Sequence, residues 1–327
     1  MRRPRVRFLY TGGTLGMLRG APGPLAPSHV AEDVVPFVRG LEEEVNVEGE
    51  LLFNLDSSDI GPGHWEHIAA VIAAERLEYD GFVVLHGTDT MAYTASALSF
   101  LLRGLDRAVV VTGAQRPIAF VRTDARANLI HSALCAAMPI PEVCVYFGRW
   151  LFRGNRTTKV NIQSYEAIES PNLPPLLEMG VECVPQERPL HPTGPFTLQA
   201  GFCEQVANIE VVPGSGPWLL DAAVARGARG VLLHGFGAGN VPRSDWPGGI
   251  RAAVDAGVAV ALASQCLHGS VNLTAYEGGR AAMDAGAMST GAMTTEAALV
   301  KLMFLLGQGL TGEALRDAYT TPLAGEG

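Results

Sequence analysis

Short apolar runs that alternate with helical patterns are the feature that most constrains the fold of this chain. The runs that predict strands lie at 5–10, 44–54, 81–86, 108–113 and 142–147. The segments that predict helices lie at 28–40, 64–77, 90–102 and 124–138. Strands that are apolar along their whole length, with helices between them, are typical of a parallel sheet covered on both faces. We therefore expect an α/β domain whose ligand binds beyond the carboxyl ends of the strands.

A proline-rich stretch interrupts this alternation after about residue 184. Four prolines fall between 185 and 196 with little periodicity, which indicates a linker. Beyond the linker, strands are expected at 209–212, 230–234 and 258–263, and helices at 217–226, 245–256, 294–306 and 312–319. The prediction is a larger N-terminal domain at 1–187, a linker at 188–207 and a smaller C-terminal α/β domain at 208–327.

Charge and cysteine content disfavour several classes of protein. The formal net charge of −9 disfavours a nucleic-acid partner. No apolar stretch approaches the length of a membrane span, and the run after the basic N-terminus ends too early for a signal peptide. The five cysteines have no CxxC spacing and indicate reduced core thiols: Cys135, Cys144, Cys183, Cys203 and Cys266. We expect a soluble cytoplasmic protein, without a membrane partner, and with neither a metal nor an organic cofactor.

Hydroxyl side chains directly follow two of the expected strands. The segment 11–14 reads Thr-Gly-Gly-Thr, and adjacent glycines let a backbone turn tightly against a ligand. A plain glycine-rich turn or a phosphate loop would also explain this segment, but the full nucleotide-binding patterns are absent. The segment 86–90 reads His-Gly-Thr-Asp-Thr. Asp89 alone would suit a helix N-cap, whereas Thr88 beside it suits a nucleophile next to a carrier of substrate charge.

Two further polar segments follow the second and fifth expected strands. The segment 56–59 reads Asp-Ser-Ser-Asp and predicts either a polar turn that caps the next helix or donors for a substrate carboxylate. The segment 156–159 ends in Lys159. A lysine in a loop is usually a solvated charge. This one follows the last strand of the first sheet, so we expect it to point into the same crevice. Lys159 can act as a base only when it is neutral, which requires burial.

Together these four segments, in this order and spacing, resemble the bacterial-type L-asparaginase family, and more closely its cytoplasmic type I branch. Shorter matching stretches lie at 112–117, 122–124, 170–175, 237–240 and 264–266. The similarity extends from about 7 to 310. The resemblance implies a flavodoxin-like N-terminal domain with a parallel sheet and a smaller C-terminal α/β domain. It also implies hydrolysis of L-asparagine to L-aspartate and ammonia without a cofactor.

The resemblance further implies roles for individual residues. Thr14 matches the primary nucleophile of the family, and Thr88, Asp89 and Lys159 match its Thr–Asp–Lys group. The substrate-binding positions that it implies are Gly13, Asp56, Ser57, Ser58, Gly87, Ala114, Gln115, Asn240, Tyr276 and Glu277. The serine pair would hold the substrate carboxylate, and Asp89 would also meet its α-ammonium. The last three positions match segments close to a neighbouring subunit's site, which predicts a homodimer or a dimer of dimers.

Two features depart from the family pattern or leave an alternative open. The loop 15–27 lacks the tyrosine that usually assists the first threonine, with Pro24 or Leu25 about where it belongs. Unless another tyrosine substitutes, Thr14 is less activated, and we expect slow turnover or a different preferred substrate. Cys266 matches a position near a second, allosteric asparagine pocket of some type I enzymes, and a core thiol is the alternative.

Two other functions use the same residues. An amidotransferase subunit that supplies ammonia carries an extra N-terminal domain, whereas the first strand here is expected from about residue 5. A non-catalytic amino-acid sensor is favoured by the missing loop tyrosine and disfavoured by the retained Thr88, Asp89 and Lys159. Hydrolysis of L-asparagine, with weak hydrolysis of glutamine, is therefore the expected function.

Overall fold

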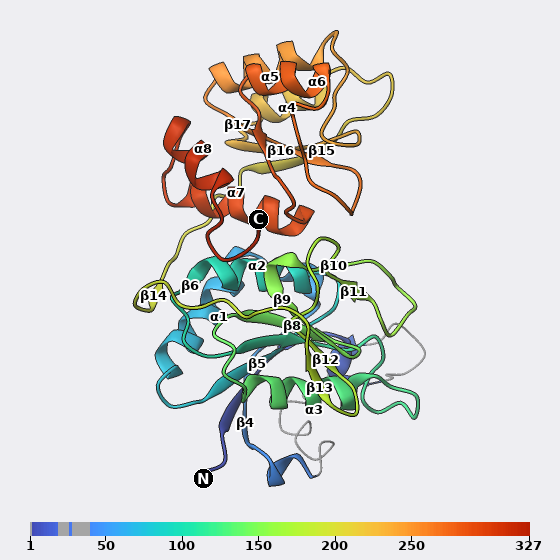
Figure 1. The fold of residues 1–327 in the computed structure, drawn as a ribbon, viewed down its shortest axis with the longest axis vertical. Helices are drawn as coiled ribbons and strands as arrows, with labels where there is room; N and C mark the ends of the chain where they lie inside the picture. Colours follow the sequence, from blue (N-terminus) through green and yellow to red (C-terminus); the bar gives the residue numbers. More distant parts are fainter. Residues whose placement is uncertain (1, 19–25, 28–39) are drawn as a thin grey trace. The chain divides into compact units, whose positions relative to one another are not determined.

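The computed structural model describes residues 2–18, 26–27 and 40–327 (Figure 1). The chain divides into two compact units, Met1–Gln199 and Ala200–Gly327. The helix expected at 28–40 and the loop position of Pro24 and Leu25 lie outside the described residues.

The first unit is built on an eight-stranded sheet in the order β13-β12-β9-β8-β7-β5-β1-β4. Its strands are β1 (Arg5–Gly12), β4 (Asn46–Leu55), β5 (Gly81–Leu85), β7 (Val109–Thr112), β8 (Val143–Phe147), β9 (Trp150–Arg153), β12 (Leu177–Met179) and β13 (Cys183–Pro185). The strands from β4 to β8 pair in parallel, as the apolar runs predict. These five strands are the ones that the sequence indicates.

Beyond the predicted parallel strands, the sheet continues at the β9 edge with antiparallel strands that the sequence did not indicate. β9 pairs antiparallel with β8, β12 with β9, and β13 with β12, so the sheet is mixed. Phe147 pairs with Trp150 across a two-residue connection in which Gly148 has a φ of +67°. A connection this short can only join antiparallel strands, since a parallel pair needs a crossover of a dozen residues or more. Gly148 was the sequence signal for this hairpin.

Helices cover both faces of the first sheet. Figure 1 shows α1 (Pro62–Glu75) and α2 (Met91–Leu101) on one face and α3 (Ala125–Ala136) on the other. Side chains alternate between the two faces along each strand, so every central strand is buried on both sides. On the α3 face, Leu129 and Ala133 of the helix join one core cluster with Val83 and Val110 of the sheet.

Short strands complete the first unit. They are β2 (Met17–Leu18), β3 (Ala26–Pro27), β6 (Leu102–Arg103), β10 (Thr158–Lys159), β11 (Ile168–Glu169) and β14 (Thr197–Leu198). β10 pairs with β11, and β14 pairs with β6, in two-stranded antiparallel ribbons. The β14–β6 ribbon ties the proline-rich stretch back onto the end of α2.

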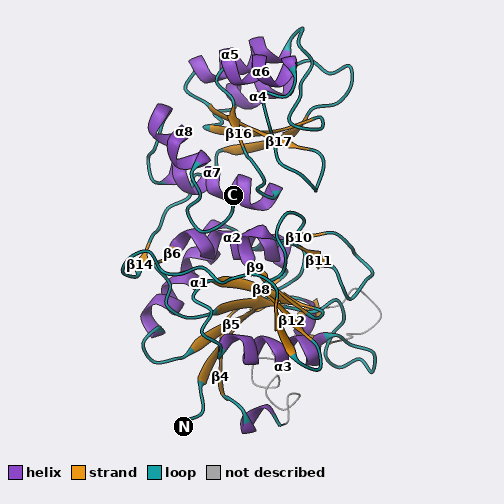
Figure 2. Ribbon diagram, in the orientation of Figure 1, coloured by secondary structure: helices purple, strands orange, loops and turns teal. Residues whose placement is uncertain are grey.

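The second unit has a four-stranded parallel sheet in the order β15-β16-β17-β18. Its strands are β15 (Val206–Glu210), β16 (Gly230–Gly235), β17 (Ala259–Ser264) and β18 (Met288–Ser289). Its helices are α4 (Trp218–Ala225), α5 (Trp246–Asp255), α6 (Glu277–Asp284), α7 (Thr295–Gly307) and α8 (Gly312–Thr320). Figure 2 shows α4, α5 and α6 on one face of this sheet and α7 on the other. The sequence prediction missed α6, which carries two glycines in its first turn, and the two-residue strand β18.

Candidate active site

Loops from three adjacent strands meet at the carboxyl edge of the first sheet. β1 lies between β4 and β5 and is parallel to both, so the segments that follow all three strands leave the sheet on the same side. The N–H of Gly13 donates to the carbonyl of Leu55 at 3.1 Å, which joins the β1 loop to the end of β4. This order of strands brings 11–14, 56–59 and 86–90 together, although they are distant along the chain.

Glycines allow these loops to touch. Gly13 has a φ of +89°, and a Cβ built on it would lie 2.4 Å from the backbone nitrogen of Gly87. A Cβ on Gly87 would lie 2.6 Å from the Ser57 side chain. Both distances are shorter than any contact that a side chain tolerates, so Gly13, Gly87 and Ser57 stack only because the two glycines have no side chains.

Lys159 reaches this edge by a route that the sequence did not suggest. It was expected to follow the last parallel strand, but it follows β9, which runs back to the opposite edge of the sheet. Arg153, at the end of β9, pairs there with Glu142 at 2.7 Å, just before β8 begins. The next turn, Gly154–Arg156, packs against α2, and the chain then returns along that helix to β10, which carries Lys159.

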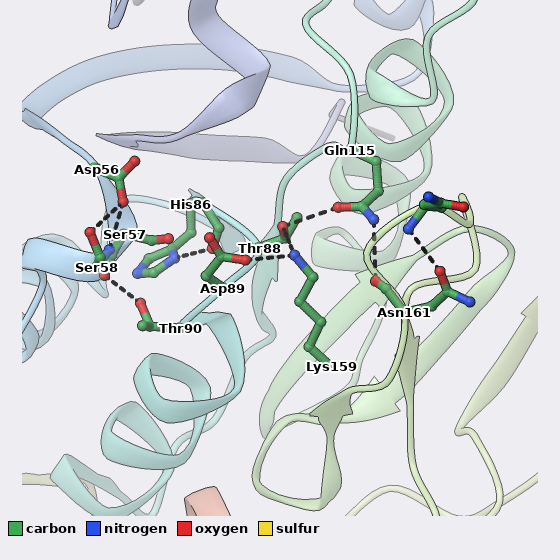
Figure 3. A network of polar contacts seen from close by, with 12 residues as sticks. Asp56, Ser57, Ser58, His86, Thr88, Asp89, Thr90, Gln115, Lys159 and Asn161 are labelled. Atoms are coloured by element: carbon green, nitrogen blue, oxygen red, sulfur yellow. Dashed lines mark hydrogen bonds and ion pairs between the residues drawn. The ribbon is translucent and has the colours of Figure 1, made fainter. Parts of the chain in front are cut away.

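The ammonium of Lys159 makes two short contacts in the site. Its Nζ donates to Thr88 Oγ1 at 2.7 Å and to Asp89 Oδ1 at 2.7 Å (Figure 3). The Lys159 side chain is 17% exposed, whereas that of Asp89 is 69% exposed. The cluster therefore has a largely enclosed cation, a buried threonine and a carboxylate that opens to solvent. Of the four predicted catalytic residues, the structure brings Thr88, Asp89 and Lys159 into direct contact.

Gln115 fixes the direction of the Thr88 hydroxyl. The side-chain amide of Gln115 donates to the carbonyls of Asn161 at 3.3 Å and Ser164 at 3.2 Å. Carbonyls only accept, so the amide oxygen of Gln115 must face the other way, and it accepts from Thr88 Oγ1 at 3.2 Å. The hydroxyl proton of Thr88 then points at Gln115, and its lone pairs remain for Lys159. Sequence reasoning assigned Gln115 to substrate binding and did not identify Asn161 or Ser164.

The segment after β4 has an ordered arrangement of hydroxyls. Asp56 caps a short 3₁₀ turn and accepts from the backbone N–H of Ser58 at 2.8 Å and from its hydroxyl at 2.7 Å. These hydrogen bonds, the one from the backbone first, lower the pKa of Asp56. Ser57 is buried, and its carbonyl accepts from the Thr90 hydroxyl at 2.6 Å. The arrangement thus joins the 56–59 turn to the start of α2.

Thr14 and Ala114 lie in neighbouring loops. Thr14 is half-buried and begins a short 3₁₀ turn directly after Gly13. Within the part of the chain that the structure describes, its hydroxyl has no hydrogen bond to Thr88, Asp89 or Lys159. Ala114 is buried next to Gln115. Contact of Thr14 with the reacting amide therefore stays a prediction.

The remaining predicted positions lie in the second unit. Asn240 bridges to Phe236 after β16, and Tyr276 is exposed at the N-cap of α6. Glu277 begins α6 and pairs with Arg243. The predicted roles of Asn240, Tyr276 and Glu277 at a neighbouring site stay predictions.

The cysteines correct one prediction. Cys135, Cys144 and Cys203 are buried, as expected of core thiols. Cys183 and Cys266 are exposed, because the first lies on the edge strand β13 and the second on the loop after β17. The core-thiol prediction is therefore wrong for Cys183 and for Cys266.

His86 is the main residue of the 86–90 segment to which the sequence gave no role. Its side chain is fully buried, and burial lowers its pKa to about 4, so the ring is neutral near pH 7. One ring nitrogen contacts the Gly87 carbonyl at 2.7 Å and the other contacts Thr94 Oγ1 at 2.8 Å. Trp65 completes the chain by donating to Thr94 at 3.0 Å. Thr94 comes from α2 and Trp65 from α1, so the 86–90 motif gave no local signal for these two partners.

Across the described ranges, no group of three or more His, Cys, Asp or Glu residues could hold a metal ion. None of the described helices is both long and apolar enough to cross a membrane.

Comparison with known proteins identifies two family domains in the chain. Residues 5–190 match the model described as "Asparaginase, N-terminal", and residues 205–319 match "Glutaminase/Asparaginase C-terminal domain". The chain is 38% identical to L-asparaginase 1 of Escherichia coli K12 over 334 residues, which cover 100% of this chain and 98% of that protein.

Two solved structures have a similar fold over nearly the whole chain. The thermostable L-asparaginase from Thermococcus kodakarensis has a TM-score of 0.92 at 33% identity, covering 98% of each chain. L-asparaginase I from Vibrio cholerae has a TM-score of 0.89 at 37% identity, covering 99% of each chain. Both domain models, the full-length similarity and the shared fold show that the chain belongs to the asparaginase family.

Proposed function

We propose that this protein is an L-asparagine amidohydrolase, which converts L-asparagine and water to L-aspartate and ammonia. The observation that carries the proposal is the contact of one lysine ammonium with both Thr88 Oγ1 and Asp89 Oδ1, each at 2.7 Å. A hydroxyl, a proton carrier and an exposed carboxylate at one sheet edge are what amide hydrolysis of an amino acid needs. The names of the relatives support the same substrate.

The reaction divides one difficult step into two. A threonine hydroxyl attacks the side-chain carboxamide carbon and gives its proton to a basic group of the site. The carboxamide oxygen becomes the oxyanion of a tetrahedral intermediate. Collapse of this intermediate breaks the C–N bond, and the leaving nitrogen takes a proton and departs as ammonia. Water then attacks the acyl-enzyme ester, releases L-aspartate and restores the hydroxyl. Thr14 and Thr88 are both retained as candidates for the first attack.

Lys159 is the proton carrier in this scheme. An ammonium has donors and no acceptor, so Lys159 must release a proton before it can accept one from Thr88. Its Nζ is already within hydrogen-bond range of the Thr88 oxygen, so once Lys159 is neutral the transfer needs only a turn of the Thr88 hydroxyl from Gln115 toward Lys159. Gln115 holds the other side of that hydroxyl and limits its rotation.

The two charged groups of the substrate have matching partners. The exposed carboxylate of Asp89 suits the α-ammonium of L-asparagine, and the donors of Ser57 and Ser58 suit its α-carboxylate. The N–H and hydroxyl of Ser58 both donate to Asp56, so Asp56 fixes the turn that carries the serine pair. The Ser58 hydroxyl turns away from Asp56 when it donates to the substrate carboxylate. This arrangement favours a free amino acid over an amide within a peptide, which lacks both charges.

The proposal has finer parts. They are a threonine nucleophile, a cytoplasmic location, a homodimer or dimer of dimers, and the domain bounds given above. An allosteric asparagine site near Cys266 is also included, and the exposure of Cys266 leaves its thiol accessible. That site predicts sigmoidal saturation by asparagine in the parent protein, which becomes hyperbolic in Cys266→Ala. Hyperbolic kinetics in the parent would refute it.

Ammonia release tests the activity. The purified chain is incubated with L-asparagine and, in parallel, with L-glutamine, and both ammonia and the amino-acid product are measured. We expect equal amounts of ammonia and L-aspartate, and slower release from glutamine. Calorimetric binding of L-asparagine without ammonia release would instead indicate an amino-acid sensor and would overturn the proposal.

A further inference from the structure

The side chain of His86 is enclosed in the core, although only Gly87 separates this residue from Thr88 in the sequence. It follows the last residue of β5, its side chain has no exposed surface, and its backbone N–H donates to the carbonyl of Thr112 at 2.8 Å. Both ring nitrogens have partners, Gly87 O at 2.7 Å and Thr94 Oγ1 at 2.8 Å (Figure 3 shows its position between Ser57 and Thr88).

The partners determine where the ring proton lies. The Gly87 carbonyl can only accept, so Nδ1 must carry the hydrogen and donate it. In a neutral ring Nε2 is then an acceptor, and the Thr94 hydroxyl donates to it. Thr94 Oγ1 in turn accepts from the indole N–H of Trp65, which has only a donor to offer. The chain of hydrogen bonds therefore runs in one direction, from Trp65 through Thr94 and His86 to the Gly87 carbonyl.

The Gly87 carbonyl and the Thr88 N–H belong to one planar peptide group. Cis peptide bonds are absent from the described residues, and in a trans peptide the C=O and N–H point in opposite directions. Because the imidazole holds the carbonyl on the core side, the Thr88 N–H points away from the core. Within residues 2–18, 26–27 and 40–327, no group accepts from the N–H of Thr88 or Asp89.

Neighbouring backbone fixes the preceding peptide group, His86–Gly87. A Cβ on Gly113 would lie 2.2 Å from the His86 carbonyl, and a Cβ on Gly13 would lie 2.9 Å from the carbonyl carbon of His86. Strands on both sides thus pack directly against the His86–Gly87 backbone. The direction of the Gly87 carbonyl is the main freedom that remains, and the His86 ring fixes it.

We propose that His86 is a positioning residue that orients the Gly87–Thr88 peptide so that the Thr88 N–H donates to the oxyanion formed from the substrate carboxamide. The inference rests on the proposed amidohydrolase activity. His86 touches neither substrate nor Lys159, so it acts through the peptide. Its Nδ1–H is the essential atom, and the Trp65–Thr94 pair is required only because it keeps the proton on Nδ1.

Substitutions at position 86 separate the two ring nitrogens. In His86→Asn the side-chain amide lies where Nδ1 was and can still donate to the Gly87 carbonyl. In His86→Gln the amide reaches the Nε2 position instead, near Thr94, and loses Gly87. We expect kcat to fall by ~30–300-fold in His86→Gln, since loss of an oxyanion donor costs about 10²–10³-fold. In His86→Asn we expect a fall of less than about 5-fold, because the amide supplies the same donor.

Binding should be spared, which distinguishes positioning from unfolding. The dissociation constant of L-aspartate and the KM for L-asparagine should stay within about 3-fold of the parent in both variants, since the oxyanion exists only in the transition state. Ser96→Ala is the control, because it removes a buried polar group near the site whose hydroxyl donates within its own helix, to the carbonyl of Ala92. It should keep parental kcat. Equal losses of kcat in His86→Asn and His86→Gln would overturn the proposal.

A spectroscopic measurement tests the inference without activity. In protein with ¹⁵N-labelled histidine, the His86 ring should show a protonated Nδ1 and an unprotonated Nε2 at pH 7. A proton on Nε2 would overturn the proposal, whatever the assays give. If the parent releases no ammonia, the proposed function fails, while the tautomer still decides whether His86 holds the peptide.

Discussion

Two lysine–carboxylate pairs among the described residues have similar geometry and opposite accessibility. In the first unit, Lys159 Nζ lies 2.7 Å from Asp89 Oδ1, and the carboxylate is 69% exposed. In the second unit, Lys301 Nζ lies 2.5 Å from Glu326 Oε1, and both side chains are essentially unexposed. The same chemical pair is thus open to a ligand in one place and enclosed by the chain in the other.

The enclosed pair is satisfied by its own surroundings. Lys301 also donates to the Thr321 carbonyl at 2.7 Å and lies 5.8 Å from the centre of the Tyr319 ring. Glu326 accepts from the backbone N–H groups of Leu323 and Ala324. These contacts hold the segment after α8 against α7. A buried pair with this many partners fixes structure, and removing one member leaves an uncompensated charge.

The open pair, Lys159–Asp89, has fewer protein partners than the enclosed pair, Lys301–Glu326. Among the described residues Asp89 has one polar partner, Lys159, and most of its side chain faces solvent. An exposed pair contributes only about 0–1 kcal/mol to stability, so its position has to be explained by what it can bind. Accessibility of the carboxylate, more than the distance within the pair, distinguishes the open pair from the enclosed one.

Thr88→Ala should give the largest effect and act on activity alone. Loss of the hydroxyl next to Lys159 should lower kcat on the order of 10³-fold or more, while the free energy of unfolding changes by less than about 1 kcal/mol. Ammonia release and thermal unfolding measure the two quantities. Thr88→Ser keeps the hydroxyl and should retain much of the activity. Near-parental turnover in Thr88→Ala would remove that residue from the mechanism.

Lys301→Met should lower the stability of the fold and leave activity unchanged. It leaves Glu326 buried without its cation, and we expect a loss of about 3–5 kcal/mol in the free energy of unfolding, measured by urea denaturation. Activity per folded molecule should stay at the parental level. The double variant Lys301→Met, Glu326→Leu removes both charges and should recover part of the loss. A Lys301→Met protein as stable as the parent would contradict the structural role of this pair.

The enclosed pair should also make stability depend on acid. Burial acts to raise the pKa of Glu326, but attraction to Lys301 and the hydrogen bonds it accepts outweigh burial and lower it from the ordinary 4.5. A carboxyl with a lowered pKa in the folded state contributes stability that is complete above pH 4.5 and is lost as the pH falls through the folded-state pKa. Unfolding of the parent below pH 4.5 should therefore be steeper than that of Glu326→Gln. Parallel curves would sink this prediction.

The smallest effect is expected from Asp56→Ala, at the open edge but away from the reacting bond. Asp56 caps the turn that carries Ser57 and Ser58, so its loss should loosen that turn and weaken carboxylate binding by about 1 kcal/mol, a ~5-fold rise in KM with kcat unchanged. Steady-state kinetics with L-asparagine measures this. A fall in kcat with constant KM would instead place Asp56 in the chemistry.

Local hydrophobic patterns predicted much of this fold, because the burial of a strand or helix determines which of its residues are apolar. The apolar runs predicted β1, β4, β5, β7 and β8, since strands covered on both faces have no polar side. Because β1 and β5 are parallel neighbours, the segments after them place Thr14 and Thr88 at the same edge of the sheet. The hairpin at Gly148 was missed, because only one glycine signals it, and the direction of β9 depends on that turn.

Contacts between elements that are distant along the chain could not be predicted from local sequence patterns. Lys159 was expected at the site, but not its return path along α2, which depends on the packing of Gly154 against Ala95. The Trp65–Thr94–His86 chain joins two helices and a strand, and the Lys301–Glu326 pair joins α7 to a segment without periodicity. In each case the partners are far apart in sequence or follow no repeat.

Ammonia release by Lys159→Met tests the central claim most directly. It is measured against Lys301→Met at equal concentrations of folded protein and saturating L-asparagine. If the open pair is the catalytic one, Lys159→Met loses kcat by on the order of 10³-fold and stays as stable as the parent, while Lys301→Met keeps its turnover. Parental ammonia release by Lys159→Met would contradict the account.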